Sequence, residues 1–266
     1  MVSKENIHKT ALVTGASSGI GREYARQLAG MGYNLLLVSN EEEQIRKVSK
    51  ELASQYGVHA TPLCMDLAQP GAAGQLYDYC REQGIEIEIL INNAGIFSFS
   101  DVADTPCSLL ESMNILHVVT PTLLCRYFGE AMRQKRKGYI LNMSSLSART
   151  PFPGIATYTA SKAYLATFSR AFHAEMKPYN VGVTAIAPGA VATNLYRLSD
   201  KLQKLGIRLG IITPAPQFAK TALRYMFKRR NVVYPGFINR MFVAIFPLIP
   251  EFIRRSSKNK LSKYEW

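Results

Sequence analysis

A tyrosine and a lysine stand four positions apart in the stretch TYTASKAYL, residues 157–165, as Tyr158 and Lys162. Residues with this spacing share one face of a helix, so their head groups can reach one ligand. A phenol with a pKa near 10 is a poor base at neutral pH, but a neighbouring ammonium favours the phenolate. We therefore predict that Lys162 lowers the pKa of Tyr158 and makes it an acid/base for a substrate oxygen. The alternative is a solvated helix face.

The stretch TGASSGIG, residues 14–21, places three glycines between an apolar run and a segment with helical periodicity. Gly15 permits a tight turn, Gly19 lets the backbone approach a pyrophosphate, and Gly21 allows close packing of helix and strand. The helix that follows offers N–H groups and the positive end of its dipole. This order predicts a dinucleotide site, and a plain glycine-rich turn is the alternative. The residues expected to line the site are Gly15, Ser17, Ser18, Gly19, Ile20 and Gly21.

The end of the second strand should meet the adenosine ribose of such a dinucleotide. An acidic residue there binds the ribose 2′-hydroxyl of NAD, whereas an arginine pairs with the 2′-phosphate of NADP. The sequence has Ser39 and Asn40 at this point, followed by Glu41. Because Ser39 and Asn40 can donate hydrogen bonds and carry no negative charge, NADP(H) is predicted over NAD(H).

Strand-length apolar runs alternate with spans long enough for a helix. The alternation implies right-handed crossovers and an α/β fold, a three-layer Rossmann-type doubly wound parallel sheet with helices on both faces. Burial on both faces explains why the strands are continuously apolar. The expected strands cover residues 10–14, 34–39, 60–65, 87–91, 139–143 and 181–187.

The pattern changes after Pro188. A loop and a helix are expected near 189–210. A further helix is expected from about Thr213, with the threonine hydroxyl as its cap and Pro214 in its first turn. Residues 189–250 are expected to form the substrate pocket.

The composition suits one folded domain over residues 1–266, since α/β folds often reach this length as a unit. Four scattered cysteines show no C-x-x-C spacing and the histidines show no metal spacing, so neither a metal site nor a disulfide framework is expected. No apolar stretch of signal-peptide length precedes the first strand, which predicts a cytoplasmic location.

Five motifs follow one another in the chain: TGASSGIG at 14–21, NNAG at 92–95, Ser145 before Tyr158, Y-x-x-x-K at 158–162 and PG at 188–189. Together they resemble the short-chain dehydrogenase/reductase family over roughly residues 8–235. The resemblance implies an NAD(P)(H)-dependent oxidoreductase that interconverts a carbonyl and an alcohol without a metal. It also implies a homodimer or homotetramer.

The family pattern implies catalytic roles for the matching residues. Lys162 would also hold the nicotinamide ribose, and Ser145 would hydrogen-bond the substrate oxygen. Asn114 would hold a water that links the lysine to solvent, although an asparagine there can also cap a helix turn. Ser144 and Ser147 are rival hydroxyls to Ser145, which is preferred for its distance from the tyrosine in sequence.

The family pattern also implies cofactor contacts. Asp66 would accept a hydrogen bond from the adenine amino group, with a cap of the following helix as the alternative. The other residues that the family places along the cofactor are Leu67, Asn93, Ala94, Gly95, Pro188, Gly189, Val191 and Thr193.

The formal net charge of +13 is concentrated near the end, because residues 197–266 hold 15 of the 32 Lys and Arg and three of the 19 acidic residues. This distribution indicates a local partner surface and argues against nucleic-acid binding. Within it, residues 237–260 carry an apolar core that Pro247 and Pro250 interrupt, too short to span a bilayer, which needs about 20 residues. The segment could lie in a membrane interface, cover the substrate cleft, or pack on the domain or a second subunit.

We expect NADPH-dependent reduction of a lipophilic ketone, such as a keto-lipid, a 3-ketosphinganine-like precursor or a steroid. A 3-oxoacyl-[acyl-carrier-protein] reductase is an alternative, since an acidic carrier would suit the basic tail. A non-catalytic NAD(P) sensor on the same fold is another, and retention of the catalytic pattern argues against it. The expected location is cytoplasmic, with peripheral contact at the inner membrane surface as an option.

Overall fold

The computed structural model describes residues 9–193 and 200–261. Within these residues, seven parallel strands form one sheet in the order β3-β2-β1-β4-β5-β6-β9, which confirms the predicted α/β fold. The strands of this sheet are β1 Thr10–Thr14, β2 Asn34–Ser39, β3 Ala60–Cys64, β4 Ile87–Asn92, β5 Gly138–Met143, β6 Val181–Ile186 and β9 Val232–Val233. The helices are α1 Gly19–Gly30, α2 Glu42–Tyr56, α3 Ala72–Glu82, α4 Cys107–Asn114, α5 Thr120–Lys135, α6 Ala156–Met176, α7 Asp200–Arg208, α8 Ala215–Phe227, α9 Phe237–Ile245 and α10 Glu251–Leu261.

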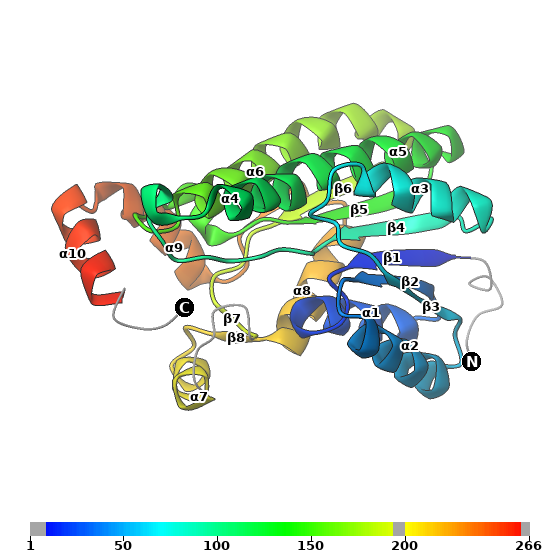
Figure 1. The fold of residues 1–266 in the computed structure, drawn as a ribbon, viewed down its shortest axis with the longest axis horizontal. Coiled ribbons are helices and arrows are strands. Elements are labelled where there is room, and N and C mark those ends of the chain that lie inside the picture. Colours follow the sequence, from blue (N-terminus) through cyan, green and yellow to red (C-terminus); the bar gives the residue numbers. More distant parts are fainter. Residues whose placement is uncertain (1–8, 194–199, 262–266) are drawn as a thin grey trace.

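Helices cover both faces of the sheet. Figure 1 shows α1, α2 and α8 on one face and α3, α5 and α6 on the other. Neighbouring residues of one strand enter different cores, as Val13 packs on the α1 side and Leu12 on the α3 side. This two-sided burial is why the strands lack the apolar and polar alternation of a half-exposed sheet.

The strand order reverses at β1, since β2 and β3 extend to one side of it while β4, β5, β6 and β9 extend to the other. In doubly wound sheets, ligands bind outside the carboxyl ends of the strands at this point. The turn after β1 and the loop after β4 lie together here, because a Cβ on Gly15 would come within 2.9 Å of the Ala94 Cα. The topology therefore joins two motifs that stand about 80 residues apart in the sequence.

The helix predicted from about Thr213 is present as α8, Ala215–Phe227, but the predicted cap by the Thr213 hydroxyl is wrong. Thr213–Pro214 form a short strand, β8, which pairs in parallel with β7, Val191–Ala192. The Thr213 N–H donates to the Ala190 carbonyl at 3.0 Å, so this segment extends beside the chain that follows β6, and α8 begins at Ala215. The region expected near 189–210 contains α7, and its residues 194–199 lie outside the described part of the chain.

Candidate active site

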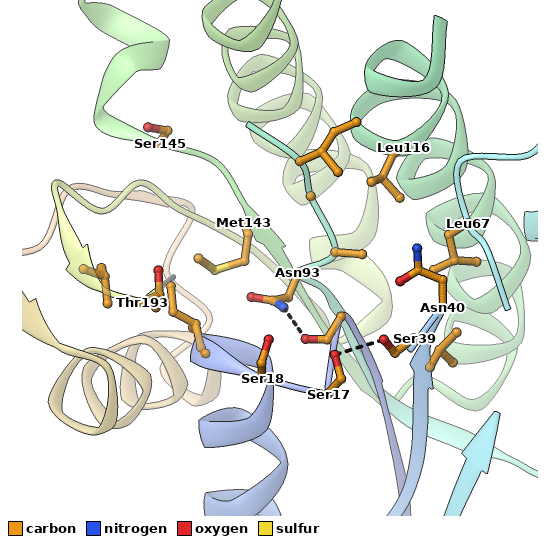
Figure 2. A pocket seen from close by; sticks show the side chains of 18 of the residues that line it. Ser17, Ser18, Ser39, Asn40, Leu67, Asn93, Leu116, Met143, Ser145 and Thr193 are labelled. Carbon is orange, nitrogen blue, oxygen red and sulfur yellow. Dashed lines mark hydrogen bonds between the residues drawn. The ribbon is translucent and has the colours of Figure 1, made fainter. Parts of the chain in front are cut away.

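A cavity of about 580 Å³ lies beyond the carboxyl ends of the central strands. This volume is within the range of roughly 300–1,000 Å³ that small-molecule sites usually have. In Figure 2, Ser39, Asn40 and Leu67 mark one end of the cavity and Ser145 and Thr193 the other, with Asn93 and Met143 between them. The predicted residues that line it are Gly15, Ser17, Ser18, Gly19, Ile20, Ser39, Asn40, Asp66, Leu67, Asn93, Ala94, Gly95, Ser145, Tyr158, Lys162, Pro188, Gly189, Val191 and Thr193.

The glycine turn opens this cavity at the N-terminus of α1. Gly15 and Gly19 have φ angles of +64° and +54°, in the left-handed region that favours glycine. Gly21 does not line the cavity, because it packs against the turn, where a Cβ would lie 2.0 Å from the Gly15 carbonyl oxygen. Ser18 precedes the helix without a side-chain cap, so the first N–H groups of α1 are left for an anionic ligand.

Asn93 supports the glycine turn from the neighbouring strand. Its Nδ2 donates to the carbonyl oxygens of Thr14 at 2.9 Å and Gly15 at 3.2 Å, and its backbone N–H donates to Thr14 Oγ1 at 2.9 Å. Its side chain therefore holds the turn in shape in addition to lining the cavity.

The end of the cavity at β2 carries polar and acidic side chains, among them Ser39, Asn40 and Glu41. The Ser39 hydroxyl donates to Ser17 Oγ at 3.0 Å and accepts from the Glu41 N–H at 3.1 Å, so it is already engaged by neighbouring groups. Asn40 is exposed and lines the cavity, and Glu41 lines it as well. The sequence analysis noted Glu41 directly after Ser39 and Asn40 but did not assign it to the site.

Asp66 forms a local turn after β3 but does not cap α3, whose N-cap is Gly71. Its carboxylate accepts from the Ala68 N–H at 3.0 Å and from Gln69 Nε2 at 2.9 Å, so it closes a local turn before α3. The same residue lines the cavity. Leu67 beside it is buried, and its carbonyl accepts from the Thr120 hydroxyl at 2.8 Å. This bond fixes the loop after β3 against α5.

Tyr158 and Lys162 lie together on α6, and each is only 5% exposed. The Lys162 Nζ is 5.6 Å from the centre of the Tyr158 ring and donates to the Met143 carbonyl at 3.0 Å. Burial lowers the pKa of Lys162 to about 8. The pair is therefore not a solvated helix face, and both residues line the cavity.

Of the three candidate hydroxyls, the structure favours Ser145. The Ser144 hydroxyl donates to the Lys162 carbonyl at 2.8 Å, so its proton is committed to α6. Ser147 does not line the cavity. Ser145 lines it, and its hydroxyl accepts from the Ser147 N–H at 3.2 Å. This contact orients the oxygen and leaves its proton for a ligand.

The structure does not bring Asn114 into the site. Its side chain is exposed, and Nδ2 donates to the Leu110 carbonyl one turn earlier at 2.9 Å. Asn114 does not line the cavity, so the structure does not group it with Tyr158 and Lys162, and the water-holding role expected for it stays a prediction. The hydrogen bond to the Leu110 carbonyl keeps the side chain on the last turn of α4, ahead of the π-helical turn Ile115–Val119.

His117 occupies the interior that Asn114 does not reach. It is 1% exposed, and its ring makes an edge-on contact with the Tyr158 ring, with 5.7 Å between centroids. Sequence reasoning missed it because His117 belongs to none of the five motifs. Its one signal was a histidine inside the apolar run ILHVV.

The donors of the cavity fit a nicotinamide dinucleotide. The N–H groups at the start of α1 suit a pyrophosphate, and the ammonium of Lys162 suits ribose hydroxyls at the Ser145 end. No three His, Cys, Asp or Glu side chains within residues 9–193 and 200–261 are grouped as metal ligands. The fold and this cavity thus define a dinucleotide-binding α/β protein.

Comparison with known proteins gives the family. The family model described as short chain dehydrogenase matches residues 9–204, so the chain belongs to this family, and the predicted resemblance is confirmed. A very-long-chain 3-oxoacyl-CoA reductase of Anas platyrhynchos is 36% identical over 196 residues, which cover 71% of this chain and 62% of that protein. The 17-beta-hydroxysteroid dehydrogenase type 3 of Danio rerio is 27% identical over 260 residues, which cover 94% of this chain and 80% of that protein.

A solved structure agrees with this assignment. The short-chain dehydrogenase from Sphingobium yanoikuyae in complex with NADPH has a TM-score of 0.77 and 26% identity, and the match covers 97% of this chain and 96% of that chain. The predicted fold and family are therefore both confirmed.

Proposed function

We propose that this protein reduces a lipophilic ketone to a secondary alcohol with NADPH. The observation that carries the proposal is the buried Tyr158 and Lys162 pair, which shares one cavity with Ser145 and with the glycine turn. A nucleotide sensor would need the turn but not a buried lysine beside a tyrosine, because burying an ammonium is unfavourable.

The residues act on the substrate oxygen. NADPH, when bound, supplies the hydride that the carbonyl carbon receives. Ser145 donates a hydrogen bond to the carbonyl oxygen and stabilises its developing charge. Tyr158 gives its phenolic proton to that oxygen, and the Lys162 ammonium stabilises the phenolate that remains.

The preference for NADPH is supported by the side chains at the β2 end of the cavity. Ser39 and Asn40 carry no charge, and the Asn40 side chain can donate to a 2′-phosphate. Glu41 opposes the preference, because its carboxylate repels a phosphate at the same end. The related Sphingobium yanoikuyae structure contains NADPH.

The substrate class is supported by the relatives and by the chain around the cavity mouth. The relatives are named for a very-long-chain 3-oxoacyl-CoA, whose acyl chain is apolar, and for a 17-beta-hydroxysteroid, whose ring system is apolar. In this protein, residues 189–250 are proposed to form the substrate pocket, and α9 packs on the cavity wall there, since a Cβ on Gly189 would meet Asn239 at 2.5 Å.

A carbonyl panel tests the reaction. Short ketones, steroids and long-chain keto-lipids, including a 3-oxoacyl thioester, are incubated with NADPH, and nicotinamide absorbance is followed. We expect turnover with apolar ketones and none with Tyr158→Phe, which still quenches NADPH fluorescence. A preference for the carrier-linked 3-oxoacyl thioester would favour the carrier-protein reductase. Turnover by the Phe variant at the native rate would refute the assignment of the proton donor.

We also propose peripheral contact with an anionic bilayer through α9. Ile238, Met241, Phe242 and Ile245 have the spacing of one helix face, and each is at least 43% exposed. Arg240 on the same helix and Arg255 on α10 add exposed positive charge. An exposed apolar stripe with basic residues beside it is typical of helices that lie in a membrane interface. No helix in the described ranges is long and apolar enough to cross a membrane.

Sedimentation with vesicles tests this contact. The native protein should bind vesicles that contain phosphatidylserine at low salt, less at high salt, and little to phosphatidylcholine alone. Phe242→Glu should abolish binding, while Met31→Glu, a matched change at an exposed position on α1's end, should not. If Phe242→Glu instead converts an oligomer into a monomer, a second copy covers the stripe and the membrane proposal fails.

A further inference from the structure

The π-helical turn Ile115–Val119 carries a buried histidine that the proposed chemistry does not use. His117 lies between the loop after β4 and the catalytic turn of α6. Isolated π-helical turns inside longer helices often occur at functional sites. Here the turn joins α4 to α5 and points Leu116 and His117 inward, while Asn114 stays outside.

The hydrogen bonds of His117 form a chain between two parts of the site. The Ile96 N–H donates to Nε2 at 3.0 Å, and Nδ1 lies 3.0 Å from the Ser161 hydroxyl oxygen. That hydroxyl donates to the Tyr158 carbonyl at 2.8 Å. The imidazole thus links the loop after β4, through Ile96, to the backbone of Tyr158 through Ser161.

These partners determine the tautomer. Nε2 faces an N–H donor and must accept, and the Ser161 proton is used on the Tyr158 carbonyl, so Nδ1 must donate. In an imidazolium, Nε2 would also carry a proton, and its N–H would face the Ile96 N–H with no acceptor between them. Burial, and then the charge of Lys162, lower the pKa of His117 well below its usual value. Among the described residues, the titratable side chains beside the ring are Tyr158 and Lys162, both on α6.

We propose that His117 is a positioning residue, held as the neutral Nδ1–H tautomer, which fixes the Tyr158 turn of α6 against the loop after β4. The inference rests on the proposed catalytic role of Tyr158. The His117 imidazole and the Tyr158 ring make an edge-on contact. The Phe97 ring makes a second edge-on contact with the Tyr158 ring, with 5.1 Å between their centroids. Gly95 leaves room for this arrangement, since a Cβ there would lie 3.0 Å from Nε2 and 3.6 Å from Lys162 Nζ.

The kinetic test uses His117→Ala and His117→Gln. The alanine variant should lose roughly 10- to 100-fold in kcat with little change in the KM for NADPH, because the proton donor is misplaced. The fall of kcat at high pH should move to higher pH in this variant. The Tyr158 ring would be held less firmly beside the Lys162 ammonium, which favours the phenolate. Glutamine can accept from Ile96 and donate to Ser161, so it should restore most of the activity and the native profile.

Ser161→Ala and the double variant test the link itself. Ser161→Ala should lower kcat in the same way, and His117→Ala with Ser161→Ala should be no worse than His117→Ala alone, because both break one chain. His173→Ala is the matched control. His173 also lies on α6 and bonds the Val183 carbonyl at 2.8 Å, so its loss affects stability but not the profile.

Imidazole ¹⁵N NMR of the native protein gives a readout that needs no turnover. His117 should show a protonated Nδ1 and an unprotonated Nε2 that do not titrate between pH 5 and 8. A protonated Nε2, a titration in that range, or a glutamine variant as inactive as the alanine variant would overturn the proposal. Failure of the proposed reaction would appear separately, as turnover by Tyr158→Phe.

Discussion

We predict that the buried Lys162 lowers the stability of the folded protein. The substitution Lys162→Met measures the size of this loss. The folded pKa of about 8 lies below the ordinary value of 10.5 because the ammonium is buried. The unfolded chain therefore binds this proton more tightly than the folded protein does. At pH 7 the difference corresponds to roughly 3 kcal/mol of lost stability, at about 1.4 kcal/mol per pKa unit.

The direction of the Lys162 pKa shift determines the pH range in which this loss of stability disappears. Because the folded pKa is lowered, the native protein gains stability from this group as the pH rises from about 8 towards 10.5, and the full cost is present below 8. Methionine has a similar shape and no charge, but it loses the ammonium's bond to the Met143 carbonyl, worth about 2 kcal/mol for a charged donor. The variant should be about 1 kcal/mol more stable than the native protein at pH 7, and the stability of the native protein relative to the variant should rise by about 2 kcal/mol by pH 9.5.

Urea unfolding at pH 7, 8 and 9.5, followed by circular dichroism, gives the two stability curves. Lys220→Met is the control, since Lys220 is exposed on α8 and its loss should leave the pH dependence of stability unchanged. Lys162→Met should also lose turnover in the carbonyl assay. Parallel curves for the native and Lys162→Met proteins would show that Lys162 keeps an ordinary pKa, and the reasoning from burial would then be wrong.

Three further changes test the cavity. Gly21→Ala should lower stability by roughly 1–3 kcal/mol and weaken dinucleotide binding, whereas Gly74→Ala on α3 should be neutral or stabilising, since a Cβ there would lie 3.8 Å from the Tyr127 hydroxyl oxygen; equal thermal melts would contradict this. Glu41→Gln should tighten NADPH binding about three- to ten-fold in a fluorescence titration, since a partly screened charge is worth roughly 1 kcal/mol, and unchanged affinity would place the carboxylate away from the 2′-phosphate. Asn114→Ala should keep kcat within about two-fold, as expected for an exposed surface residue, and a large loss would return this residue to the site.

Local patterns in the sequence predicted most of the sheet. β1 and β2 begin and end at the expected residues, and β3 to β6 each differ from expectation by one residue at one end, because strands buried on both faces are continuously apolar. β9 has two residues, Val232–Val233, and was not predicted, since two residues carry no periodic pattern. Thr213 and Pro214 have the residue types of a helix start, but pairing with β7 decided their structure.

The sequence by itself determined the glycine turn and the Tyr158 and Lys162 pair, because each depends on contacts within a few residues of one strand end or one helix face. Only the tertiary structure decided that Ser145 and not Ser144 offers its proton, that Glu41 lines the cavity, and that Asn114 lies outside while His117 lies inside. Those outcomes depend on which groups α6, β2 and the π-helical turn bring together across the fold. No spacing along one segment contains that information.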